Sequence, residues 1–254
     1  MKITFELNPP KIVKDERLDL LIIDQEIQTL LRRASLLIEY VDGIHLTDSV
    51  LGVPRMSSIT AARLLKDAHN PLNVSCSIRT RDRNFTAICQ FVLDAILLGV
   101  DGLLVLMGDE PSAGPKSFGL KPSDVLRMLR YERYDSAIDL NLTIPSELKE
   151  ISSIQRKIEA KPKAFVSQSI KSLSDLGHIV DIIKPYGIKI VACIMAPSEK
   201  NKLSAEMIGL DFKEYENYPV DFIRQASKIA DEVLLTSPNS FRTGLDLLSK
   251  LKGK

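Results

Sequence analysis

Eight short apolar runs, separated by segments with helical periodicity, constrain the fold of this chain more than any other feature. They lie near residues 2–7, 43–47, 72–78, 102–107, 137–142, 163–168, 188–195 and 232–236. Eight strand–helix units in 254 residues have the size and rhythm of a closed (β/α)8 barrel, the TIM-barrel fold. A doubly wound open sheet is the main alternative, but no Gly-x-Gly-x-x-Gly follows the first run. We therefore predict an α/β protein that forms one TIM-barrel domain over residues 1–254.

The segments between the runs support this alternation. Residues 20–31 and 88–96 carry apolar side chains at the three- and four-residue spacing of one helix face. Ser123-Asp124 and Pro145-Ser146-Glu147 have the composition of helix starts, and the latter predicts a helix running towards Ile158.

Composition excludes several classes of function. The net charge of +1, from 34 basic and 33 acidic residues, predicts no bulk attraction to nucleic acid or to a membrane. No apolar run approaches the roughly 20 residues of a membrane span, and the strand-like start lacks a signal-peptide core. Cys76, Cys89 and Cys193 are odd in number and widely spaced, as expected of core residues in a reduced compartment. We expect a soluble cytoplasmic protein.

Three polar residues, Glu6, Asp109 and Gln168, fall at the ends of apolar runs. The carboxyl ends of the strands are where a (β/α) barrel builds its active site. Alternation along the first run places Glu6 opposite Ile3 and Phe5. A partly desolvated carboxyl there has a raised pKa and can donate a proton near neutrality, whereas a glutamate that simply reaches water is the alternative.

Asp109 follows Gly108, and the two open a long connection over residues 108–122. Glycine allows close backbone approach to a flat ligand, and the neighbouring acid can accept from ring N–H groups. A plain Gly-Asp turn is the alternative. Gln168 offers both a donor and an acceptor to a pterin or flavin edge, or bonds to its own loop. A second long connection is predicted over residues 196–202, and both are candidates for ligand contact.

Basic residues and histidines carry weaker signals. The turn Arg79-Thr-Arg-Asp-Arg-Asn84 either holds a phosphate or is an internally paired surface turn. Lys157 lies on a helical segment, where it reaches a phosphate or only solvent. His45, His69 and His178 show no metal-ligand spacing and no nucleophile partner.

Four segments, in order along the chain, resemble the methylenetetrahydrofolate reductase family. Phe5-Glu-Leu-Asn-Pro-Pro-Lys11 is similar to its Phe-Glu-Phe-Phe-Pro-Pro-Lys opening, and Thr80-Arg-Asp-Arg-Asn84 to its Cys-Arg-Asp-Arg-Asn element. Leu106-Met-Gly-Asp-Glu-Pro111 resembles its Leu-Arg-Gly-Asp-x-Pro turn. Gln155-Arg-Lys-Ile-Glu-Ala, followed by Phe165-Val-Ser-Gln168, resembles its Lys-Arg-Lys-x-x-Ala-Gly-Ala…Phe-x-x-Thr-Gln segment.

The resemblance implies a TIM barrel that holds a flavin, usually FAD with FMN as the alternative. It implies reduction of 5,10-methylene-tetrahydrofolate, or a related tetrahydropterin, to the 5-methyl form. NADH or NADPH is the implied electron donor, and relatives are usually homo-oligomers. The resemblance also assigns residues: Glu6 as general acid, Asp109 beside flavin and pterin, Gln168 and Arg242 on the substrate, and Thr47, Ser77, Gly108, Asp109 and Lys157 on the cofactor.

The chain departs from the family pattern at three places. Met107 stands where the family has arginine, and Ser77 where many members have histidine. Leu140-Asn-Leu-Thr-Ile-Pro-Ser146 replaces an Ala-Tyr-Pro-Glu-x-His run. These losses leave two alternatives open. One is a non-catalytic pterin- or flavin-binding subunit of a reductase or methyltransferase complex, and the other is an unrelated TIM-barrel lyase or transferase.

Overall fold

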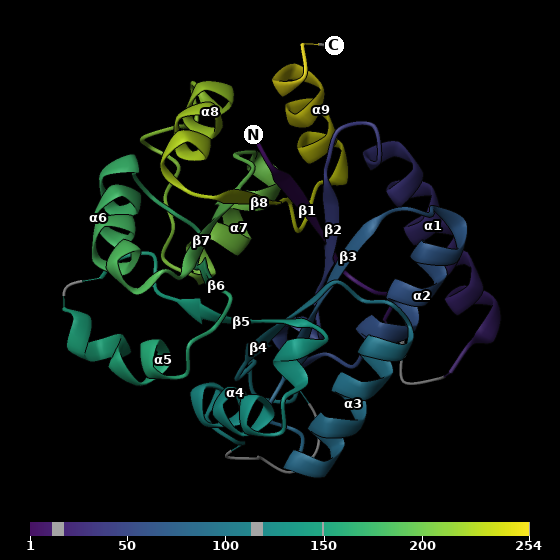
Figure 1. Ribbon diagram of the computed structural model, residues 1–254. Helices are drawn as coiled ribbons and strands as arrows, with labels where there is room; N and C mark the ends of the chain where they lie inside the picture. Colours follow the sequence, from purple (N-terminus) through teal and green to yellow (C-terminus); the bar gives the residue numbers. More distant parts are fainter. Residues whose placement is uncertain (12–17, 113–118, 149, 254) are drawn as a thin grey trace. The chain divides into compact units, whose positions relative to one another are not determined.

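The computed structural model describes residues 1–11, 18–112, 119–148 and 150–253, so part of the predicted 108–122 connection, residues 113–118, lies outside the described residues. Eight parallel strands follow one another in a closed barrel, which confirms the predicted TIM-barrel fold (Figure 1). The strands are β1 (Ile3–Leu7), β2 (Gly43–Leu46), β3 (Asn73–Arg79), β4 (Gly102–Leu106), β5 (Asp139–Ile144), β6 (Ala164–Ser167), β7 (Lys189–Met195) and β8 (Glu232–Thr236). Each overlaps one of the eight predicted runs.

Helical segments alternate with the strands along the described chain. They are α1 (Leu20–Leu37), η1 (Val50–Gly52), α2 (Ser58–Ala68), α3 (Phe85–Leu97), α4 (Pro122–Tyr131), η2 (Tyr134–Ser136), η3 (Ile151–Ile154), α5 (Gln155–Glu159), α6 (Leu173–Ile183), η4 (Lys184–Tyr186), α7 (Glu199–Met207), α8 (Pro219–Ile229) and α9 (Phe241–Leu251). No helix in this part of the chain is both long enough and apolar enough to cross a membrane.

The chain divides into two compact units. We call one the β6–β8 unit; it holds residues 1–6, 37–42 and 143–254. We call the other the β2–β4 unit; it holds residues 7–36 and 43–142. The prediction of one domain over residues 1–254 stays a prediction.

In the β2–β4 unit the two faces of β3 differ in chemistry. Cys76 points to the helix side, where its Sγ lies 3.4 Å from the carbonyl oxygen of Ser58 in α2. Because side chains alternate along a strand, Ser75, Ser77 and Arg79 lie on the opposite face. His45 of β2 pairs in register with Ser75. The face turned away from the helices is therefore polar in this unit.

In the β6–β8 unit, β7 pairs with β6 and β8, and β8 pairs in turn with β1. Helices α6 and α8 lie side by side against β7 (Figure 1). At β1, the ring of Phe5 packs edge-on against Phe241. A Cβ at Gly244 of α9 would lie 2.6 Å from that ring, so a glycine is needed for α9 to approach β1 this closely.

Two predicted boundaries are wrong. Residues 145–148 after β5 are not helical, and helical structure begins only at Ile151. The segment buries Leu148 and pairs Glu147 with Lys171 at 2.8 Å, contacts that a helix start at Pro145 would displace. The predicted long connection over residues 196–202 is short, because α7 begins at Glu199. The helix sequence there is mostly polar, so it lacks the apolar periodicity that marks the other helices.

Candidate functional site

Glu6, at the carboxyl end of β1, is a carboxyl group that accepts a hydrogen bond from one neighbouring side chain and has little solvent around it. Its Oε1 accepts from the hydroxyl of Thr236, the last residue of β8, at 2.7 Å. Burial raises the pKa of Glu6 above its ordinary value, and the Thr236 hydrogen bond opposes that shift without cancelling it. The direction matches the one predicted from the sequence. A group of this kind keeps its proton to higher pH and can donate it.

A thiol and an amide accompany Glu6 in the same unit. Burial raises the pKa of Cys193 on β7 to about 12, and the charge of Glu6 adds to the shift. Cys193 is therefore a neutral thiol, with its Sγ 3.8 Å from the hydroxyl of Ser169. Gln168 follows β6, and its backbone N–H donates to the carbonyl of Ile144 at 2.8 Å. The Gln168 side chain is exposed and has no partner among the described residues, which leaves its amide free for a ligand.

The two basic residues assigned to this unit behave differently from each other. Lys157 of α5 donates from Nζ to the carbonyl oxygen of Thr143 at 2.7 Å, and burial lowers its pKa. Lys157 therefore contacts the end of β5 in this structure, and its assignment to a phosphate stays a prediction. Arg242, at the start of α9, has a side chain that is 91% exposed, with its Nε 3.9 Å from Asp246. The assignment of Arg242 to the substrate stays a prediction.

In the β2–β4 unit, Asp109 follows β4 and contacts the loop after β2. Its Oδ2 accepts from the backbone N–H of Leu51 at 2.8 Å. Leu51 has a φ of 57°, a left-handed conformation that is unusual for leucine. The second carboxylate oxygen of Asp109 has no partner within the described part of the chain, and the residue is exposed. Asp109 thus has a structural contact and one oxygen left for a ligand.

Arg79 connects three loops of the β2–β4 unit, and sequence reasoning missed this role. Its side chain is only 2% exposed. The guanidinium donates to Asp82 at 2.7 Å, to the carbonyl of Ser49 at 2.7 Å and to the carbonyl of Asp109 at 2.6 Å. The internally paired alternative for the 79–84 turn is therefore confirmed for Arg79, but its placement on the surface is wrong.

Gly108 is required by the same arrangement. Its φ is +80°, and a Cβ at this position would lie 2.8 Å from Cγ of Arg79. Both the backbone conformation and the close approach of the arginine favour glycine. The glycine thus serves the packing of Arg79 in this structure, and its contact with a flat ligand stays a prediction.

His45 lies between two serines of the neighbouring strand. Its Nδ1 is 2.8 Å from Oγ of Ser75 and its Nε2 is 2.8 Å from Oγ of Ser77. Burial lowers the pKa of His45 to about 4, so the ring is neutral at physiological pH. The sequence shows a histidine between Ile44 and Leu46 in an apolar run, which indicates a buried imidazole. Its hydrogen-bond partners could not be predicted, because they lie 30 and 32 residues away along the chain.

Thr47, the remaining cofactor-side residue, also has an internal partner: its hydroxyl donates to Oδ1 of Asn8 at 2.6 Å. The structure thus brings Glu6 together with Thr236 in one unit and Asp109 together with Gly108 and Arg79 in the other. Among residues 1–11, 18–112, 119–148 and 150–253, no group of three or more histidine, cysteine or acidic side chains is arranged to bind a metal ion.

Comparison with known proteins supports the fold alone. No family model matches the chain, and no curated protein matches it. A ligand-free TrpA mutant of tryptophan synthase from M. tuberculosis matches at a TM-score of 0.59 and 12% identity, over 99% of this chain and 90% of that one. A structure described as QR15, an aldolase, matches at 0.57 and 9% identity, over 98% and 94%. Both names are those of enzymes. The structural similarity establishes the TIM-barrel fold, but identities this low do not determine an enzyme class.

Proposed function

We propose that this chain is a flavin-dependent reductase that converts a 5,10-methylene-tetrahydropterin, such as 5,10-methylene-tetrahydrofolate, to the 5-methyl form. NADH or NADPH is the proposed electron donor. The observation that carries the proposal is Glu6, a mostly buried carboxyl with a raised pKa at the carboxyl end of β1. Its support is the resemblance of four ordered segments to the methylenetetrahydrofolate reductase family, whose general acid matches Glu6.

The proposed role of Glu6 is to supply one proton. Opening the methylene bridge requires protonation of the pterin nitrogen that leaves, and the product of that step is an iminium able to accept hydride. A carboxyl that is kept protonated by desolvation is suited to this step near neutral pH. Thr236 donates to Oε1 and so fixes the orientation of the carboxyl group.

Two further side chains fit the edge of a pteridine or flavin ring. The Gln168 amide has no internal partner in the described chain and offers both a donor and an acceptor. Asp109 has one carboxylate oxygen that is not used by Leu51. When bound, a flavin would supply the hydride transfer; the resemblance implies that Gln168 contacts the pterin and that Asp109 lies beside the flavin and pterin.

The phosphate side of a cofactor fits less well. The ammonium of Lys157, which the resemblance assigns to the FAD phosphates, donates one of its three N–H groups to the carbonyl of Thr143, and this contact ties it to the end of β5. The proposal therefore rests on the flavin ring, with FAD as the expected cofactor and FMN as the alternative. A homo-oligomer is expected from the resemblance and forms part of the proposal.

The test is the visible absorption spectrum of the purified protein, before and after addition of excess FAD or FMN and removal of the unbound part. We expect flavin bands that bleach anaerobically with NADH or NADPH and return on addition of 5,10-methylene-tetrahydrofolate. Flavin that stays oxidised with both donors, or stays reduced with the pterin, would contradict the proposed reaction.

A second candidate is a non-catalytic subunit that binds pterin in a larger complex. It is favoured by one observation: Thr47, Ser77 and Lys157, all assigned to the cofactor, each contact a protein partner. A colourless preparation that takes up no flavin but binds tetrahydrofolate by calorimetry would support this candidate. A preparation that binds neither would leave an unrelated TIM-barrel enzyme.

A further inference from the structure

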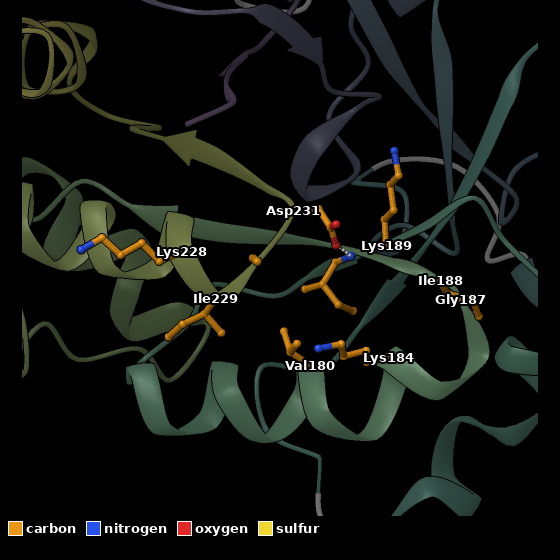
Figure 2. Close-up of a pocket in the computed structure, with 10 residues that line it drawn as sticks. Val180, Lys184, Gly187, Ile188, Lys189, Lys228, Ile229 and Asp231 are labelled. Carbon is orange, nitrogen blue, oxygen red and sulfur yellow. Dashed lines mark hydrogen bonds between the residues drawn. The ribbon is translucent and has the colours of Figure 1, made fainter.

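A cavity of about 450 Å³ lies in the β6–β8 unit, at the amino-terminal end of β7 (Figure 2). It is lined by α6 and η4, by the end of α8 and by the segments that lead into β7 and β8. Its volume falls within the range of small-molecule sites. The cavity lies at the opposite end of β7 from Met195, the carboxyl-terminal residue of that strand. It is therefore separate from the strand end at which β8 presents Thr236 to Glu6.

The rim of this cavity is positively charged. Lys184, Lys189 and Lys228 line it, and all three are exposed without an ion-pair partner among the described residues. Figure 2 shows the Lys184 ammonium directed towards Val180, while Lys189 and Lys228 extend outwards. Asp231 is the one acid among the lining residues, and its Oδ2 already accepts from the backbone N–H of Ile190 at 2.8 Å. The lining thus carries three positive charges and one negative charge.

The floor of the cavity is apolar. Val180 and Ile229 are half-buried and supply accessible apolar surface, whereas Ile188, Ile190 and Ala230 line the cavity but are buried and expose little of theirs; the stem of Lys184 extends this surface. An inorganic anion would satisfy the charge and leave this floor in contact with water. A neutral hydrocarbon would cover the floor and gain nothing from the lysines. The combination fits a ligand that has both an apolar body and an anionic group.

Helix ends also bear on the charge of the site. The carbonyl ends of α6 and α8 face this region and disfavour an anion. Lys184, just after α6, and Lys228, in the last turn of α8, offset those ends. Lys189 is the first residue of β7 and has no helix end to neutralise. The positive charge of the rim therefore exceeds what the helix termini require.

We propose that this cavity is a binding site for a small anionic amphiphile, a molecule with a hydrocarbon or ring body and one carboxylate or phosphate group. The apolar body packs on the isoleucine floor, and the anionic group pairs with Lys184. Lys189 and Lys228 turn inwards on their four-carbon stems to share that charge. The site is independent of the flavin and pterin chemistry proposed above.

The experiment compares four probes of matched size or charge: octanoate, octyl phosphate, octanol and inorganic phosphate. Titrations are followed by calorimetry and by the methyl NMR signals of isoleucine, since Ile188, Ile190 and Ile229 form the floor. We expect the two amphiphilic anions to bind and to shift these signals first. Octanol and inorganic phosphate should each bind at least about tenfold more weakly, because each satisfies only half of the site.

Variants then test the charged rim. Lys184→Gln should weaken octanoate binding by about threefold, and the triple change of Lys184, Lys189 and Lys228 to glutamine by about tenfold or more, the scale of partly exposed charge pairs. Lys184→Arg should restore most of the affinity. The matched control is Lys250→Gln, which removes an exposed lysine from the last turn of α9 and should change nothing.

Several outcomes would overturn the proposal. Octanol binding as tightly as octanoate would show an apolar cleft without anion recognition. An unchanged affinity in the triple variant, or shifts confined to isoleucines outside the floor, would place the ligand elsewhere. Concentration-dependent dimerisation that is lost in the triple variant would assign the cavity to a second copy of the chain. Flavin bands and pterin turnover are measured separately, so failure of either proposal leaves the other standing.

Discussion

The two units differ in how many hydrogen bonds their buried charged group makes. In the β2–β4 unit, Arg79 is almost fully buried and its guanidinium donates to Asp82, Ser49 and Asp109. In the β6–β8 unit, Glu6 has a single hydrogen bond, from Thr236, and a pKa raised by burial. The β2–β4 unit pairs the buried guanidinium of Arg79 with three partners, whereas the β6–β8 unit holds a carboxyl that keeps its proton to a higher pH than an exposed glutamate does.

This difference separates a structural role from a chemical one. A fully paired network fixes a unique arrangement of loops, and its loss is costly because each partner is left without its hydrogen bonds. A carboxyl with a perturbed pKa and few partners is the kind of group that active sites contain. The β2–β4 unit therefore provides a scaffold that fixes the loops after β2, β3 and β4, and Glu6 is the group that we propose to be reactive.

The largest effect is expected from Arg79→Met. This change keeps an unbranched apolar stem, shorter than that of arginine, and removes every hydrogen bond of the guanidinium, so Asp82 and two carbonyl oxygens lose a donor. We expect the free energy of unfolding in urea to fall by about 3–5 kcal/mol, the usual cost of breaking a buried charged pair.

The matched control is Arg63→Met. Arg63 pairs with Asp67 on the surface of α2 at 2.7 Å, and both side chains are about half exposed. Such pairs contribute about 0–1 kcal/mol. If the two variants lost equal stability, Arg79 would have no special structural role and the contrast between the units would fail.

We expect the free energy of unfolding to depend on pH because of His45. Its pKa is lowered from 6.5 to about 4 in the folded chain, so protonation favours the unfolded state. Its stabilising contribution is fully present above pH 6.5 and is lost as the pH falls towards 4, by about 3 kcal/mol in all. Urea unfolding between pH 4 and 7 should show this loss in the wild type. His45→Asn should remove it, whereas His69→Asn, at a half-buried histidine, should leave it in place.

Glu6→Gln should slow reduction of 5,10-methylene-tetrahydrofolate by the reduced flavin by about 100-fold or more, the scale of general acid catalysis. Reduction of the flavin by NADH or NADPH needs no proton from Glu6 and should be nearly unchanged. Stopped-flow absorbance measures the two half-reactions separately. The matched control is Glu232→Gln, the same substitution at the first residue of β8, at the opposite end of that strand from Thr236. It should leave both rates unchanged. Equal loss in both half-reactions would remove Glu6 from the acid role.

The same substitution tests the pKa shift without any turnover. Because the folded-state pKa of Glu6 is raised, the folded chain favours the protonated form, and stability is lost as the pH rises above 4.5 through the folded pKa. Glutamine mimics the neutral acid at every pH. The Gln variant should therefore match the wild type near pH 4 and become the more stable of the two as the pH rises.

The fold was largely predictable, because alternating apolar runs and amphipathic helices are local signals. The misplaced helix start at Pro145 shows the limit: burial of Leu148 and the Glu147–Lys171 ion pair prevail over a local helix signal. The burial and the raised pKa of Glu6 could be predicted because its position follows from alternation along one strand, and its catalytic role stays a prediction. Arg79 and His45 were not, because their partners are set by register between strands, and a dense charged turn is typical of a surface.

Asp109 has both a structural contact, with Leu51, and a carboxylate oxygen that is open to a ligand. We expect its substitutions to change stability the least and to show which of the two roles it has. Asp109→Asn keeps an oxygen that can accept from Leu51, so stability should change by less than about 0.5 kcal/mol. Asp109→Ala leaves the Leu51 N–H without this acceptor, beside a left-handed backbone, and should cost about 1 kcal/mol. If Asp109 also binds ligand, the Asn variant should weaken pterin binding and alter the flavin spectrum while remaining as stable as the wild type.

An Asn variant with wild-type flavin and pterin behaviour, together with a destabilised Ala variant, would show that Asp109, like Arg79, has a structural role only.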